Sequence, residues 1–153
     1  MATQVKPKPR VLYDEDFYAW SRQQAALLRD GRFAELDLAH LIEEVNDLGG
    51  ALKRSVRSRI RTIIEHLLKL EHSPAQDPRG GRYDTIITQR GDLVDELTPS
   101  IRREVEPELA VLYDRARAAA ATSLRKHDEP TAADALPADC PYSLDQITGD
   151  WWP

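Results

Sequence analysis

Hydrophobic residues recur every three to four positions through most of the chain, which is the spacing of one face of an α-helix. The longest such pattern begins after Asp37 and keeps its phase past Gly49 and Gly50. Its members are Leu38, Leu41, Ile42, Val45, Leu48, Leu52, Val56, Ile60, Ile63, Leu67 and Leu70. Glycine inside a helix costs about 1 kcal/mol relative to alanine. The pattern therefore predicts either one kinked helix over residues 37–72 or two nearly collinear helices.

Shorter segments with the same period lie on both sides of this one. A helix is expected to start at Asp14, because an aspartate at the N-cap accepts from the first free N–H groups. It is expected to end at Gly31, which tolerates a left-handed conformation. A further helix is expected over about residues 83–98, and a long one after Pro99. Pro107 lacks a backbone donor and predicts a kink or a fresh start in that last helix.

The overall pattern predicts an all-α fold. No sustained alternation of apolar and polar residues indicates a strand, and no repeat recurs at a fixed period. We expect an antiparallel bundle of four to five helices over residues 12–127. Residues 1–11 are expected to form a flexible arm, and the acidic, proline-rich residues 128–153 a tail that packs back on the bundle. Within the tail, Ser143 and Gln146 match a capping box, which indicates one short helical turn.

Composition narrows the class of protein without indicating an activity. The chain has 153 residues, 41% of them hydrophobic, which is enough for one domain with a real core. Its net charge of −5 disfavours a strongly basic nucleic-acid binder. One cysteine excludes an internal disulfide framework and a cysteine-cluster zinc site. No apolar run approaches the roughly 20 residues of a membrane helix. The charged N-terminus lacks the apolar region of a secretion signal, so a cytoplasmic location is expected.

Several residues of the long helical pattern are of types that bind metals or transfer protons. They are His40, Glu43, Glu44, Glu65, His66 and His72. Di-iron sites in helix bundles use Glu-x-x-His pairs, which this chain lacks, so no metal or other cofactor is expected. His40, Glu43 and Asp47 lie opposite the apolar face, which is typical of solvated positions. Glu44 and His66 fall near its edge, where His66 could be a ligand, a general base or a structural residue, and the structural interpretation is favoured.

Two further features could bind macromolecules. The first is a basic run over residues 53–61, but the chain is acidic, no aromatic residues interleave with the cations, and the acidic tail could neutralise them. The second is the pair Trp151 and Trp152, whose large apolar side chains could anchor in a partner or fold back over the bundle. Folding back is the favoured use of the two tryptophans, and nucleic-acid binding is the weakest of the functions considered.

Blocks of sequence spread over about residues 12–153 carry a family resemblance. They are Leu12-Tyr13-Asp14-Glu15-Asp16-Phe17-Tyr18-Ala19-Trp20, Arg32-Phe33-Ala34-Glu35-Leu36-Asp37, Leu41-Ile42-Glu43-Glu44-Val45, His66-Leu67-Leu68-Lys69, Thr85-Ile86 with Gln89-Arg90, and Cys140-Pro141-Tyr142-Ser143-Leu144. In this order they resemble the bacterial domain of unknown function 29 family. The resemblance implies an almost entirely helical fold and no assigned activity. Its blocks contain Glu43, Glu44, His66 and Arg90. The chain departs from the family where an aromatic-Arg pair is expected before Thr85.

Two interpretations of function follow. The leading one is a non-catalytic helical interaction protein with an unknown protein partner, which binds through a groove or through Trp151 and Trp152. It involves no membrane, and an apolar face left exposed would favour a homo-oligomer. The alternative is an enzyme or metal-binding protein with a polar site of Glu44, His66 and Arg90, hydrolytic on small or phosphorylated substrates. That alternative requires the three side chains to converge.

Overall fold

The computed structural model describes residues 9–153, which contain helices and no strand, as the periodicity predicts. The chain divides into two compact units, Met1–Gly50 and Ala51–Pro153. Most of the predicted N-terminal arm, residues 1–8, lies outside the described residues. The remaining residues of that arm are helical, because the first helix begins at Pro9.

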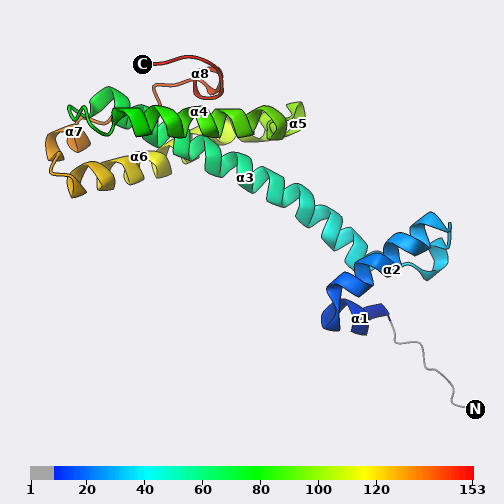
Figure 1. The fold of residues 1–153 in the computed structure, drawn as a ribbon. Coiled ribbons are helices and arrows are strands. Elements are labelled where there is room, and N and C mark those ends of the chain that lie inside the picture. Colours follow the sequence, from blue (N-terminus) through cyan, green and yellow to red (C-terminus); the bar gives the residue numbers. More distant parts are fainter. Residues whose placement is uncertain (1–8) are drawn as a thin grey trace, which may run out of the picture. The chain divides into compact units, whose positions relative to one another are not determined.

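The first unit contains α1 (Pro9–Glu15), α2 (Phe17–Arg29), η1 (Phe33–Glu35) and the start of α3 (Leu38–His72) (Figure 1). The expected N-cap at Asp14 is wrong, because Asp14 lies inside α1. The cap is Asp16, whose Oδ1 accepts from the N–H of Ala19 at 2.9 Å. Gly31 follows α2 with a φ of 69°, which confirms the left-handed residue expected there.

The apolar pattern after Asp37 forms a single helix, α3, without a break at the glycines. A Cβ built at Gly49 would meet no atom within 4 Å, so no packing contact explains the missing side chain at that position. The structure thus decides between the two alternatives in favour of one helix of 35 residues.

The second unit contains the rest of α3 and six further elements. They are α4 (Arg79–Glu96), α5 (Pro99–Val105), η2 (Glu106–Glu108), α6 (Leu109–Lys126), α7 (Pro130–Asp134) and α8 (Leu144–Thr148). Pro107 lies in η2 between two helices, so the predicted break is confirmed. The capping box of Ser143 and Gln146 at the start of α8 is also confirmed. The start of α4 is four residues earlier than expected, and α7 is a helix that the periodicity does not indicate.

Side chains from α3, α4, α5, α6, α7 and α8 form the core of the second unit. In α3 the buried apolar positions begin at Val56. The largest fully buried side chains are Tyr113, Ile60, Ile63, Ile64, Leu67, Leu68, Ile86, Leu93, Leu112, Leu124, Leu144 and Ile147. The apolar face of α3 is therefore the centre around which the other helices of this unit pack.

Two adjacent residues of α6 provide a matched test of this core. Leu112 is buried and Val111 is half exposed. We expect Leu112→Ala to lower the free energy of unfolding by about 2–5 kcal/mol, because it removes buried methyl groups and leaves a cavity. Val111→Ala should change it by less than about 0.5 kcal/mol. Urea unfolding followed by circular dichroism measures both values, and equal losses would contradict this assignment of the core.

Candidate functional site

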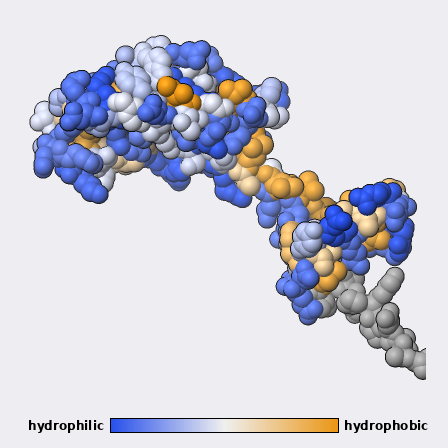
Figure 2. Space-filling model, viewed as in Figure 1, coloured by the Kyte–Doolittle hydropathy of each residue, from blue (hydrophilic) through white to orange (hydrophobic). Residues whose placement is uncertain are grey.

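The N-terminal part of α3 exposes its apolar face to solvent. Leu38, Ile42, Val45 and Leu48 are 58, 61, 66 and 72% exposed. We call these four side chains the exposed stripe. Figure 2 shows hydrophobic side chains at the surface along this part of the helix. Single exposed apolar side chains are ordinary, but a contiguous row on one helix face is typical of an interaction surface.

Helices α1 and α2 pack against the polar side of α3 and leave the stripe uncovered. The ring of Tyr13 stacks on that of His40 with 3.9 Å between centroids. The Tyr13 hydroxyl donates to Glu44 Oε1 at 2.5 Å, which is the main reason that the pKa of Tyr13 is raised to about 12. Trp20 Nε1 donates to Asp37 Oδ2 at 3.2 Å. Tyr13 and Trp20 thus bond polar side chains of this unit.

Glu44 and His40 therefore make contacts that connect elements of the first unit. Glu44 accepts from Tyr13, and His40 Nδ1 lies 2.7 Å from Asp37 Oδ2. Glu43, the other carboxylate of the pair, is exposed. The sequence placed His40 on the solvated face, which is wrong because Tyr13 covers its ring.

Arg90 is buried in α4 and holds the C-terminal segment. Its Nε donates to the carbonyl of Ile147 at 2.9 Å, and its Nη2 donates to the carbonyls of Gln146 at 2.8 Å and Trp151 at 2.7 Å. Its guanidinium carbon also lies 4.6 Å from the centre of the Trp152 ring, a cation–π distance. A guanidinium satisfies several carbonyls at once because its donors form a rigid fork.

The two terminal tryptophans contact side chains of the second unit. The rings of Trp152 and Tyr83 lie 4.9 Å apart, and those of Trp151 and Tyr142 lie 5.7 Å apart. Both indoles are half-buried. The Tyr142 hydroxyl donates in turn to Glu71 Oε2 at 2.7 Å, which connects the tail to the end of α3. These contacts leave neither indole fully available to a partner.

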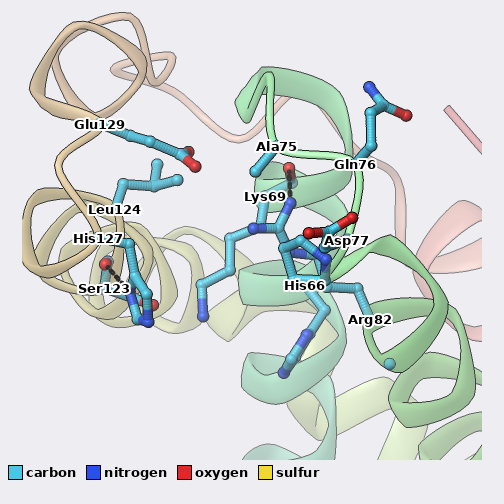
Figure 3. Close-up of a pocket in the computed structure, with 12 residues that line it drawn as sticks. His66, Lys69, Ala75, Gln76, Asp77, Arg82, Ser123, Leu124, His127 and Glu129 are labelled. Atoms are coloured by element: carbon cyan, nitrogen blue, oxygen red, sulfur yellow. Dashed lines mark hydrogen bonds between the residues drawn. The ribbon is translucent and has the colours of Figure 1, made fainter.

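His66 lines a cavity of about 600 Å³ in the second unit. Figure 3 shows it with side chains from the end of α3, the loop that precedes α4, the start of α4 and the end of α6. Burial lowers the pKa of His66, and the nearby charges of Lys69 and Arg82 add to the effect, so the neutral ring is favoured. Its Nδ1 is buried and has no hydrogen-bond partner among the described residues. Arg90 does not line this cavity.

The three residues of the catalytic alternative belong to two units. Glu44 lies in the first unit, and in the second unit His66 lines the cavity whereas Arg90 bonds the C-terminal segment. Among residues 9–153 no group of three or more histidine, cysteine or acidic side chains is placed to hold a metal. The sequence does not predict that Lys69, Arg82 and His127 line one cavity. They are far apart along the chain and meet only in the folded structure.

Several cations in the basic run of α3, Lys53, Arg57 and Arg59, pair with acidic side chains of neighbouring elements rather than with the tail. Lys53 Nζ lies 3.0 Å from Glu104 and 3.1 Å from Glu108. Arg59 pairs with Asp92 at 2.5 Å and with Glu96 at 3.0 Å. The expectation that the acidic tail neutralises this run is wrong for these cations, which α4, α5 and η2 pair instead. The pairing leaves fewer free cations for phosphate contacts.

Comparison with known proteins identifies a family. A family model described as a domain of unknown function, DUF29, matches residues 12–152. No curated protein and no solved structure matches the chain. Among the described residues, no helix is long and apolar enough to cross a membrane.

Arg90 and Arg102 allow a matched test of the link to the tail, because both contact residues of α8. Arg102 Nη2 pairs with Asp145 at 2.7 Å, but that carboxylate is mostly exposed. We expect Arg90→Gln to lower the free energy of unfolding by about 3 kcal/mol, since it deprives buried carbonyls of their donor. It should also shift tryptophan emission to the red as the indoles gain water. Arg102→Gln should cost under about 1 kcal/mol. Similar losses in the two variants would contradict the assigned role of Arg90.

The lowered pKa of His66 predicts a pH dependence of stability. An unfolded histidine takes up its proton near pH 6.5, whereas folded His66 does so only at lower pH. Below about 6.5 the unfolded chain therefore binds more protons, and the free energy of unfolding falls as the pH decreases. His66→Gln should reduce this fall, measured by urea unfolding above and below pH 6.5. His127→Gln, at an exposed position, should keep the wild-type dependence, and an unchanged dependence in His66→Gln would refute the burial effect.

Proposed function

The chain belongs to the family described as domain of unknown function DUF29, and we propose that it is a non-catalytic helical interaction module that pairs with a second copy of itself. The observation that carries the proposal is the exposed stripe of α3. Its four side chains are more than half exposed, although they continue the same apolar pattern that is fully buried farther along the helix. A bacterial, cytoplasmic setting stays a prediction from the sequence.

The spacing of the stripe favours another helix as the occupant. Three side chains of the stripe and the half-buried Leu41 beside them have the spacing three, four and three: Leu38, Leu41, Val45 and Leu48. This is the alternation of the a and d positions in a coiled coil, where each apolar side chain enters a hole on a facing helix. Ile42 lies beside that seam and widens it. A helix with the same spacing is the partner that such a seam fits.

The charges of α3 permit that partner to be the same segment of a second copy. No charged residue falls among the stripe positions on the helix face. Glu43 and Asp47 lie on the opposite side of the helix, and Glu44, at the edge of the stripe, is bonded to Tyr13. Two copies can therefore bring their stripes together without opposing like charges. Self-pairing in closed two-fold symmetry is also the commonest assembly of soluble proteins.

The contacts of Glu44 and Arg90, two residues of the catalytic alternative, support a non-catalytic function. Glu44 is committed to Tyr13 and Arg90 to three backbone carbonyls. The two tryptophans of the tail, the other candidate interaction surface, contact Tyr83, Arg90 and Tyr142 of their own chain. The exposed stripe remains as a contiguous apolar row of the first unit that α1 and α2 do not cover.

A pair of double variants tests the proposal. Ile42→Gln with Val45→Gln removes the centre of the stripe, and Ile87→Gln with Val94→Gln makes the same substitutions at exposed positions of α4. Sedimentation velocity at micromolar protein concentration should show a dimer for the wild type and the α4 variant, and a monomer for the stripe variant. Glutamine is a good helix former, so circular dichroism should show equal helix content in all three.

A monomeric wild type, or a stripe variant that still dimerises, would refute self-pairing. A monomeric wild type that binds a different protein through Ile42 and Val45 would also refute it, while keeping the stripe as the interaction surface. Loss of the dimer in both variants would place the interface elsewhere.

A further inference from the structure

The cavity beside His66 contains charged side chains that the proposed function does not use. Lys69 lines it and is only 8% exposed, which is rare for a lysine. Its amine pairs with Glu65. Arg82 lines the same cavity, and its Nη1 donates to the carbonyl of Lys69 at 2.9 Å. Arg82 is thus tied to the backbone of Lys69 where α3 and α4 meet, and both side chains line the cavity (Figure 3).

Both cations keep donors that their known contacts do not use. An ammonium has three N–H donors and a guanidinium has five, and one hydrogen bond is accounted for at each of these side chains. Burial also lowers the pKa of Arg82. A buried cation is stabilised when an anion shares its low-dielectric surroundings, so this wall is suited to an oxyanion.

Two buried polar atoms of the cavity residues have no hydrogen-bond partner among the described residues. They are Nδ1 of His66 and Oε2 of Glu129. An unpaired buried polar atom costs free energy, and native proteins leave few of them. Glu129 follows α6, whereas Lys69 and Arg82 belong to α3 and α4. An acceptor on one wall and cations on another match a ligand with an anionic group and a separate donor group.

We propose that this cavity binds a small molecule with an oxyanion, either a carboxylate or a phosphate, and a hydrogen-bond donor such as an ammonium group. Lys69 and Arg82 hold the oxyanion, and Glu129 accepts from the donor. The cavity volume of about 600 Å³ lies within the range of small-molecule sites. Glu129 and the exposed Asp77 at the cavity disfavour a purely anionic ligand, because both add negative charge.

Glycine and O-phosphoethanolamine are suitable probes, since each joins an ammonium to one of the two oxyanions. Each is titrated into the full chain at constant ionic strength, and the histidine ring signals of His66 and His127 are followed by NMR. We expect saturable shifts of both rings. Response to glycine identifies a carboxylate site, and response to O-phosphoethanolamine identifies a phosphate site.

Arg79 provides the matched control for Arg82. Each donates through Nη1 to a carbonyl near the end of α3, Arg79 to Leu70 at 2.8 Å, but only Arg82 lines the cavity. Arg82→Gln should weaken binding about tenfold or more, the usual effect of losing a charge-assisted hydrogen bond. Arg79→Gln should bind like the wild type.

Glu129→Gln is a second variant that does not touch the α3–α4 contact. It should also weaken binding of either probe, because the ammonium loses its carboxylate. Absence of saturable shifts with both probes would overturn the proposal. Equal weakening in Arg79→Gln and Arg82→Gln would overturn it as well, since it would indicate a general effect of charge.

Discussion

Coverage of one apolar helix face is the constraint on which this structure depends. The hydrophobic pattern of α3 runs in one phase through 35 residues, so the whole helix presents a continuous apolar face. From Val56 onward that face is the buried centre of the second unit, where α4, α6 and α8 pack on it. From Leu38 to Leu48 it is exposed. The same sequence pattern thus builds the core in one unit and leaves a surface in the other.

Two sets of polar contacts hold α1 and the C-terminal segment in their places within the two units. In the first unit, Tyr13 stacks on His40 and donates to Glu44, which holds α1 against the polar side of α3. In the second, Arg90 gathers three carbonyls of the C-terminal segment. Burial of a guanidinium carries a desolvation cost that several charge-assisted hydrogen bonds offset. Two residues of the catalytic alternative, Glu44 and Arg90, thus take part in contacts that connect segments within each unit.

The sequence predicts elements whose signals are local and misses contacts that depend on tertiary structure. Helical periodicity predicts α3, and the missing donor of Pro107 predicts the break before α6. The early start of α4 is missed because Gly80 and Gly81 resemble a loop, yet both lie inside the helix. The sequence singles out Glu44 and Arg90, but their partners lie 31 and 57 residues away. No periodic pattern reports on contacts of that separation.

The cavity beside His66 is the clearest example of a feature that the sequence pattern does not predict. Lys69, Arg82 and Glu129 have no common motif and meet only because α3, α4 and the segment after α6 meet. The exposed stripe is the opposite case. Its pattern is plain in the sequence, but whether it is covered depends on where α1 and α2 pack.

The pairing of two stripes is tested most directly by a distance between two copies. Asn46 is exposed on the face of α3 next to the stripe. A spin label at Asn46→Cys, in a chain that also carries Cys140→Ser, gives one label per copy, and pulsed electron paramagnetic resonance measures the separation of the labels. Pairing through the stripe predicts a single short distance between copies, which is lost when Val45 is replaced by glutamine. Labels that show no defined separation would contradict the account.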